Sequence, residues 1–296
     1  MRVPDVVLKC VGFVGEVTHR DEMGISGDLC ATGFFVSVPC QSQRLRGIQF
    51  VYFVTAKHVA SDLKGREIYF LVNRIGGGVT PFTNVFGNHW YLHPTDKTAD
   101  VAVIQAGLQR DADIKTVFIT NFATPQKIAE MDIGIGDEVF ATGLFTPATG
   151  TSRNEPILRY GNIAMMPAEQ IQTELGFADV YLVEARSIGG LSGSPVFVRP
   201  TITLPIPEQP GGVKHAFCVG HGATLLGLMQ GHWDIEESQI NAPSVMHNHR
   251  RGVNMGFGIV VPATKIVETI NRSELAETRR QLEQAELDKN RVRTGG

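Results

Sequence analysis

Residues 189–197 read GGLSGSPVF, which places a serine in a glycine-rich turn directly before an apolar stretch. Gly190 and Gly193 stand on either side of Ser192, and glycine accepts the unusual backbone angles that tight turns require. The stretch from Pro195 onward is rich in Val and Phe, which favour β-strands. A glycine-serine turn is usually only a flexible connection, so its meaning depends on what the rest of the chain supplies.

Strand-like runs recur at short intervals along the chain, and turn-forming residues separate them. No helical period of useful length occurs before residue 263. This pattern predicts an all-β architecture of barrels or sandwiches. The expected strands are Val6–Val11, Thr32–Val38, Gln49–Thr55, Glu67–Asn73, Val101–Ala106, Glu138–Thr142, Val180–Glu184, Pro195–Arg199, Leu225–Gln230 and Phe257–Val261.

The composition excludes several classes of protein. Glycine makes up 32 of 296 residues, against roughly 7% in an average protein, and its scattered placement argues against collagen and low-complexity chains. The 43% of hydrophobic residues can build a core, so a mainly disordered chain is not expected. The 27 Lys and Arg against 30 Asp and Glu give a net charge of −3, which argues against nucleic acid as a partner. No apolar run approaches the ~18–20 residues of a membrane span, so we expect no membrane partner.

The cysteines favour a reducing compartment. No two of them form a C-x-x-C pair, which excludes the common zinc and redox motifs. An extended stretch over residues 30–40 separates its ends by about 33 Å at ~3.3 Å per residue, too far for a disulfide, although a bend at Pro39 would change this. The N-terminal MRVPDVVLKC is not a secretory signal, so we expect reduced thiols and a cytoplasmic location, an expectation that fails if a signal was removed. The cysteines are Cys10, Cys30, Cys40 and Cys218.

Two further motifs give the serine turn a chemical meaning. Residues 53–59 read FVTAKHV, a β-run that ends in His58, and residues 99–104 read ADVAVI, in which Asp100 opens an apolar strand. Taken singly, such a histidine is usually structural and such an aspartate a turn former. Taken together, they complete the set that a serine nucleophile needs: an imidazole to remove its proton and a carboxylate to orient the imidazole. The backbone N–H groups of a tight turn supply donors for the oxyanion.

In the order His58, Asp100, Ser192, these motifs resemble the chymotrypsin-like (trypsin-fold) serine proteases, especially the bacterial HtrA-type and glutamyl-endopeptidase-like branch. TAKH at 55–58 looks like T-A-x-H, DVAV at 100–103 like D-[IV]-A-[LV], and GLSGSP at 190–195 like G-x-S-G-[GS]-P. The resemblance extends over most of residues 5–270 through three further stretches. They are ATGFFV at 31–36, IGDEV at 135–139 and GFGIVVP at 256–262.

The resemblance implies a role for each site residue and no cofactor or metal. Ser192 would be the nucleophile, His58 the general base and then acid, and Asp100 the orienting carboxylate. The backbone N–H groups of Gly190 and Ser192 would form the oxyanion hole. Arg186 falls where the family often sets the floor of its specificity pocket. An arginine at such a position more often points into solvent, and it would favour an acidic substrate side chain only if it points into the pocket. The residues expected to meet substrate are Arg186, Gln230, Gly231, His232, Gly256 and Gly258.

The implied fold is all-β, with two six-stranded antiparallel β-barrels (trypsin-like fold) and a C-terminal α-helix. Residues 1–115 would form the N-terminal barrel with the histidine and aspartate, 116–262 the C-terminal barrel with the serine and oxyanion hole, and 263–296 a C-terminal helix and charged tail. The implied function is a serine endopeptidase that acts through an acyl-enzyme, a regulated intracellular protease with a specific protein target. The alternatives are a catalytically silent binding or scaffold protein on the same fold, and an esterase that uses the same triad.

Three departures from the family pattern bear on activation, cellular compartment and substrate specificity. Leu191 stands where members activated by propeptide cleavage carry Asp, so activation by a new N-terminus is not expected. Val59 replaces a half-cystine of secreted animal members, which agrees with a reducing compartment. Met229 stands nearest the position of a histidine that reads acidic side chains in glutamyl endopeptidases, so that specificity is not supported.

Three segments are candidates for contact with a regulatory protein partner. The proline-rich residues 200–215 and residues 234–252 flank the expected substrate-facing strand, and loops of this length are often functional. Residues 273–293 combine helix formers with a thin leucine stripe, which fits either a solvated tail or a docking helix. The HNH at 247–249 has no neighbouring Cys, Asp or Glu to complete a metal site, and GGG at 76–78 lacks the Lys-Ser/Thr of a phosphate loop.

Overall fold

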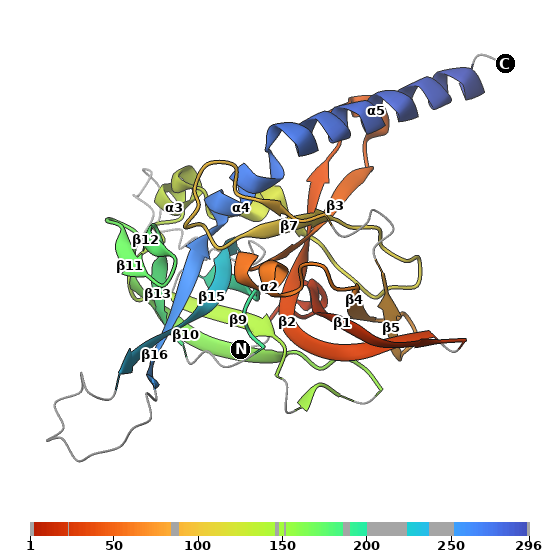
Figure 1. The fold of residues 1–296 in the computed structure, drawn as a ribbon. Helices are drawn as coiled ribbons and strands as arrows, with labels where there is room; N and C mark the ends of the chain where they lie inside the picture. Colours follow the sequence, from red (N-terminus) through yellow and green to blue (C-terminus); the bar gives the residue numbers. More distant parts are fainter. Residues whose placement is uncertain are drawn as a thin grey trace, which may run out of the picture.

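The strands form two units that lie side by side, with two helices at one end (Figure 1). The computed structural model describes residues 3–22, 24–83, 89–145, 148–150, 152–185, 190–199, 224–236 and 252–294. The sheet that holds the N-terminal half uses strands up to Phe118, and the sheet of the C-terminal half begins at Glu138. The chain between them includes the short helix α3 (Pro125–Glu130), which Thr124 caps by accepting the backbone N–H of Lys127.

The C-terminal unit is a closed six-stranded antiparallel barrel in the order β10-β13-β16-β15-β14-β9. This half of the expected fold agrees with the sequence interpretation. Its strands are β9 (Glu138–Gly143), β10 (Ile157–Met165), β13 (Tyr181–Glu184), β14 (Pro195–Arg199), β15 (Thr224–Glu236) and β16 (Gly252–Pro262). A separate hairpin joins β11 (Ile171–Thr173) to β12 (Gly176–Ala178).

The N-terminal unit is an open sheet of eight strands, which corrects the expectation of a second six-stranded barrel. The path runs β5-β4-β1-β2-β3-β7-β6, and β8 pairs with β2 in parallel. The end strands β5 and β6 are short, and Pro81 in β5 has no N–H to donate to a further strand, which suits an edge. The strands are β1 (Val11–Asp21), β2 (Gly24–Pro39), β3 (Gln49–Thr55), β4 (Ile68–Asn73), β5 (Val79–Phe82), β6 (Tyr91–Leu92), β7 (Ala102–Gln105) and β8 (Val117–Phe118).

The start of the chain is a helix, not the strand expected over Val6–Val11. Helix α1 (Asp5–Lys9) carries an acidic residue in its first turn and a basic one in its last, which favours a helix through its dipole. Val7 and Cys10, three residues apart, are both fully buried. Strand β1 begins only at Val11. Cys10, Cys30 and Cys40 are free thiols, whereas Cys218 lies outside the described residues.

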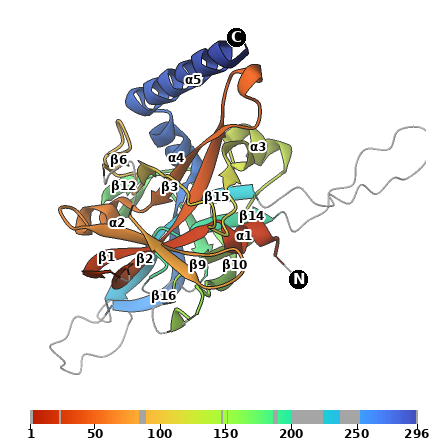
Figure 2. The same cartoon turned by 90° about the vertical axis from the view of Figure 1, so that its right-hand side faces the viewer.

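The C-terminal segment forms two helices in place of one helix and a tail. Helix α4 (Ala263–Ile270) buries Ile266 and Ile270 in the largest hydrophobic cluster of the described residues, which includes residues of both sheets. Helix α5 (Ser273–Thr294) buries Leu275 near its start and leaves Leu282 44% exposed. Its far end projects away from the rest of the protein (Figures 1 and 2). Among the described helices, none combines the length and apolarity needed to span a bilayer.

Candidate active site

The pairing of two strands brings His58 and Asp100 together. Strands β3 and β7 are antiparallel, with Thr55 opposite Ala102, so the residues just after β3 face those just before β7. His58 lies in the first turn of α2 (Lys57–Asp62), which follows β3 after one residue. Its Nδ1 lies 2.7 Å from Asp100 Oδ2, and its backbone N–H donates to Asp100 Oδ1 at 2.9 Å. Because a carboxylate only accepts, Nδ1 carries the proton and Nε2 is left as an acceptor.

The burial of the two side chains differs, and this sets the electrostatics. The Asp100 side chain is fully buried, whereas that of His58 is 39% exposed, so the carboxylate is fixed inside the protein while the imidazole reaches solvent. Burial alone lowers the pKa of His58, but the hydrogen bond and charge of Asp100 outweigh it, and the net result is a raised pKa. The arrangement therefore stabilises the imidazolium form that a general base passes through.

Two carboxylates that the sequence interpretation missed also act on His58. The negative charges of Asp62 and Glu174 contribute to its raised pKa. Asp62 lies four residues after His58 in α2, a spacing that puts both side chains on the same helix face. A prediction of this helix from the sequence would have placed Asp62 near His58. Glu174 lies in the turn between β11 and β12, and nothing local in the sequence indicates that this hairpin reaches the histidine.

Ser192 lies in a tight turn immediately before β14. The Ser194 N–H donates to Leu191 O at 3.0 Å, and the flanking Gly190 and Gly193 have φ angles of +93° and +83°, in the left-handed region that suits glycine. The Ser192 Oγ donates to the backbone oxygen of Gln230 at 3.3 Å. In the part of the chain that the structure describes, no hydrogen bond joins Ser192 to His58.

Thr32 on β2 ties the serine turn to the N-terminal sheet. Its N–H donates to Ser192 O at 3.1 Å and its hydroxyl donates to Gly190 O at 2.7 Å. The same hydroxyl accepts the N–H of Leu144, and the Thr32 carbonyl accepts the hydroxyl of Thr55 at 2.7 Å. Thr32 is fully buried, so this residue of the N-terminal sheet holds both the serine turn and Leu144, which follows β9 of the C-terminal barrel. It belongs to the ATGFFV stretch, which the sequence interpretation treated only as a strand.

Gly193 brings the turn close to the segment that carries His58. A Cβ built at this glycine would lie 2.1 Å from Thr32 O, 2.3 Å from Thr55 Oγ1 and 3.2 Å from Ala56 N. Only glycine fits such an approach. Since Ala56 precedes His58 by two residues, the turn that holds Ser192 is packed against the end of β3, just before the helical turn that carries the histidine.

The turn also holds donors suited to an anionic oxygen. Within the described residues, the backbone N–H groups of Gly190 and Ser192 have no hydrogen-bond partner. Leu191 between them is 1% exposed, so an apolar side chain anchors the turn. Fixed N–H donors beside a serine hydroxyl are the feature that stabilises a tetrahedral oxyanion.

The expected substrate strand is β15, next to the serine turn. Gly231 and His232 pair with Ile259 and Gly258 of β16. Gln230 is 9% exposed, and its side-chain Oε1 has no partner among the residues described. A Cβ on Gly231 would meet nothing within 4 Å among these residues, which leaves space beside the strand.

The remaining candidate residues divide into two groups. Gly256 adopts a φ of +83°, which favours glycine, and Gly258 packs closely against the Met229 thioether, where a Cβ would lie 3.0 Å from the sulfur. Arg186 lies outside the described residues, as do residues 200–215 and 237–251. His247 and His249 of the HNH stretch also lie there, and the described part of the chain contains no group of three metal-binding side chains.

No protein-family model matches the chain, and no curated protein does. Among solved structures, the chain is similar to the protease domain of MamO from Magnetospirillum magneticum in its apo form, with a TM-score of 0.50 and 16% sequence identity. The match covers 88% of this chain and 96% of that one. The fold is protease-like. At this level of identity the likeness concerns the fold alone, so the chemistry of this chain rests on its own residues.

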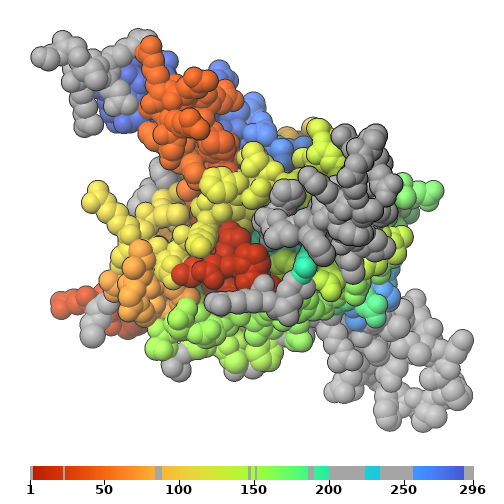
Figure 3. All heavy atoms as spheres, turned by 180° about the vertical axis from the view of Figure 1, so that it is seen from behind, coloured from red at the N-terminus to blue at the C-terminus, as the bar shows by residue number. Residues whose placement is uncertain are grey.

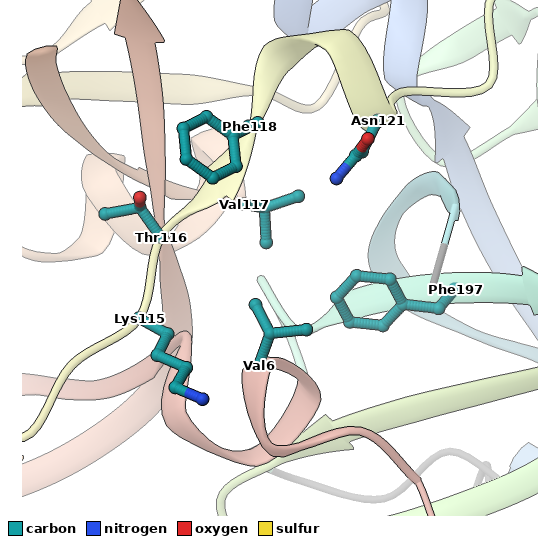
Figure 4. Close-up of a pocket in the computed structure, with 7 residues that line it drawn as sticks. All are labelled: Val6, Lys115, Thr116, Val117, Phe118, Asn121 and Phe197. Atoms are coloured by element: carbon teal, nitrogen blue, oxygen red, sulfur yellow. The ribbon is translucent and has the colours of Figure 1, made fainter. Parts of the chain in front are cut away.

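A cavity of about 390 Å³ lies apart from these residues, where α1, residues 115–121 and β14 meet (Figure 4). Its lining is mostly apolar, and Lys115, its cation, pairs with Asp5 at 3.7 Å. Seen from behind, the N-terminal residues (red) lie between the yellow segment that includes residues 115–121 and the green strands of the C-terminal barrel (Figure 3). None of His58, Asp100 and Ser192 lines this cavity, so it is not the candidate reaction site. It is lined by Val6, Lys115, Thr116, Val117, Phe118, Asn121 and Phe197.

Proposed function

We propose that this protein is a serine endopeptidase that cleaves peptide bonds through Ser192, His58 and Asp100. The observation that carries the proposal is the hydrogen bond between His58 Nδ1 and the fully buried Asp100, with the serine turn packed against the same strand end. A buried carboxylate that fixes the imidazole with Nε2 as an acceptor is the arrangement that activates a neighbouring hydroxyl.

In the proposed reaction, the Ser192 hydroxyl turns from Gln230 O to His58 Nε2. As Ser192 Oγ attacks the carbonyl carbon, its proton passes to Nε2, and Asp100 stabilises the imidazolium. The oxyanion of the tetrahedral intermediate accepts hydrogen bonds from the N–H groups of Gly190 and Ser192. His58 then gives the proton to the leaving amine, and water attacks the acyl-enzyme by the same route in reverse.

The substrate backbone would add to the edge of β15 at Gln230, Gly231 and His232. The open space beside Gly231 supports this placement, since an extended peptide needs a close approach to the strand. With Leu191 buried in the turn, activation by a new N-terminus is not part of the proposal. A regulated intracellular role with a specific protein target, and contact with a partner through residues 200–215, 234–252 or α5, remain parts of the proposal.

A second candidate function is a catalytically silent binding protein on the same fold. The specific observation in its favour is that Ser192 Oγ donates to Gln230 O and not to His58. The proposed endopeptidase requires the Ser192 hydroxyl to reach His58 Nε2, and catalytic hydrogen bonds often form fully only when substrate is bound. An esterase on the same residues would differ in substrate, not in mechanism.

An unbiased peptide library separates these functions. The full chain is incubated with the library, and new termini are identified by mass spectrometry for the wild type, Ser192→Ala and Ser194→Ala. We expect cleavage by the wild type and by Ser194→Ala, and a loss of about 10³-fold or more in Ser192→Ala. Turnover of activated esters without peptide cleavage would identify an esterase, and no turnover of either substrate would favour the silent binding protein.

A further inference from the structure

Helix α4 and the turn that follows it contact the segment that leads into Asp100. Lys265 and Glu268 lie three residues apart on one face of α4, and Arg272 follows in the turn between α4 and α5. All three meet residues 91–96 (Figure 2 shows β6 beside α4). The Arg272 guanidinium donates to Leu92 O at 2.9 Å and lies 5.3 Å from the Tyr91 ring centroid.

The inner two contacts reach the loop after β6. His93, whose side chain is 2% exposed, pairs through Nε2 with the Glu268 carboxylate at 2.6 Å. Lys265 Nζ donates to Asp96 Oδ2 at 2.7 Å, and these two side chains are 16% and 20% exposed. The Lys265–Asp96 pair is therefore the most protected charge pair of this face, and Asp179 adds a second carboxylate 3.6 Å from the ammonium.

Asp96 passes this contact on to the catalytic loop. Its Oδ1 accepts three hydrogen bonds, from Thr98 N at 2.8 Å, Thr98 Oγ1 at 2.7 Å and Ala99 N at 3.2 Å. Ala99 is bonded directly to Asp100, so one carboxylate fixes both residues that precede the candidate orienting group. Burial alone would raise the pKa of Asp96, but the bonds from Lys265 and Thr98 hold it well below the usual range, so the pair stays charged at neutral pH.

We propose that Lys265 is a positioning residue for the candidate active site: it holds Asp96, and Asp96 holds the loop that aims Asp100 at His58. Helix α4 thereby belongs to the support of the site as well as to the hydrophobic core. The consequence for the reaction rate rests on the proposed function. The consequence for the His58–Asp100 pair does not, because it can be measured in the protein without substrate.

The test is an NMR titration of the His58 ring in the full chain, for the wild type, Lys265→Met and Lys9→Met. Lys9 is the matched control, because it forms a 2.9 Å ion pair with Asp113 at the end of α1, away from the loop. The groups that act on His58 are Asp100, Asp62 and Glu174. Removing a distant cation would by itself raise the pKa of His58, whereas a displaced Asp100 would lower it.

We expect the pKa of His58 to be lower in Lys265→Met than in the wild type and in Lys9→Met. A folded Lys265→Met protein with an unchanged or higher pKa of His58 would overturn the proposal. Lys265→Arg, which keeps the charge and a donor for Asp96, should restore the wild-type titration.

A second variant covers the case in which Lys265→Met fails to fold. Asp96→Asn combined with Lys265→Met leaves no unpaired buried charge and adds no net charge, while the amide oxygen still accepts from Thr98 and Ala99. Without the contact between Lys265 and residue 96, the loop is no longer tied to α4, so we expect the His58 pKa of this variant to fall below that of the wild type, and an unchanged pKa would overturn the proposal.

The rate supplies an independent readout. If the wild type cleaves peptides, Lys265→Met should lose about 10–100-fold in kcat with little change in KM, since a small displacement of a catalytic group affects the reacting geometry and not substrate affinity. A loss confined to KM would contradict a positioning role. If the wild type cleaves nothing, the proposed function fails, and the titration of His58 still decides the role of Lys265.

Discussion

Replacing Gly193 with alanine places a methyl group where the serine turn meets the N-terminal sheet. The new Cβ would lie 2.1 Å from Thr32 O and 2.3 Å from Thr55 Oγ1, and the residue has a φ of +83°. The left-handed backbone costs a non-glycine residue about 1–2 kcal/mol. Overpacking of a site without room adds about 1–3 kcal/mol. The free energy of unfolding should therefore fall by about 2–5 kcal/mol.

Gly136→Ala is the matched control for this prediction. Gly136 has a similar φ of +94°, but a Cβ there meets nothing within 4 Å among the described residues, so only the backbone cost of about 1–2 kcal/mol applies. Urea denaturation measures both variants, and at a slope of about 1–3 kcal/mol per M the Gly193 variant should unfold roughly 1 M earlier than the control. Equal midpoints for the two variants would refute the close approach at Gly193.

Three further predictions follow from the contacts of the site and of α5. The rate of peptide cleavage should rise with pH, with a midpoint above the ordinary pKa of histidine, because Asp100 raises the pKa of His58 and only the neutral ring accepts the serine proton. A pH profile of kcat/KM measures this midpoint, and a midpoint below the ordinary pKa of histidine would contradict the prediction. Thr32→Val leaves the buried Gly190 carbonyl and Leu144 N–H without their hydroxyl partner, which costs about 1–3 kcal/mol for each group. Urea denaturation should therefore show a clear loss of stability, and an unchanged midpoint would contradict the role of Thr32 in linking the serine turn to the N-terminal sheet. Arg279→Ala removes the hydrogen bonds from α5 to Tyr52 Oη and to the carbonyl of Ile270, the last residue of α4, so amide hydrogen exchange in α5 should become faster. Unchanged protection of the α5 amides would show that other contacts hold this helix.

Much of the candidate site could be predicted from the sequence because its parts lie at the ends of strands with strong local signals. The strand predicted over Gln49–Thr55 has the bounds of β3, and the one predicted over Val101–Ala106 contains β7. Once these two strands pair, the positions of His58 and Asp100 follow from the register. The catalytic role of the three residues remains a prediction.

Other features depend on contacts that no local pattern reveals. The open N-terminal sheet depends on whether β5 and β6 meet, and residues on separate strands decide that. Strand β10 was missed, because Gly161 interrupts its apolar pattern; a Cβ there would lie 2.0 Å from Glu184 O, so close strand approach excludes a side chain. The link from Lys265 to Asp96 spans 169 residues of chain, and charged residues on a helix are ordinarily read as a solvated face.

The central claim is that Ser192 is a nucleophile activated by His58, and covalent labelling tests it most directly. The full chain is treated with a fluorophosphonate, digested, and analysed by mass spectrometry to find the modified residue. We predict a phosphonylated peptide modified at Ser192 in the wild type and in Ser194→Ala, and no labelling in His58→Ala. Labelling at another serine, labelling that persists without His58, or an unmodified Ser192 in the wild type would contradict it.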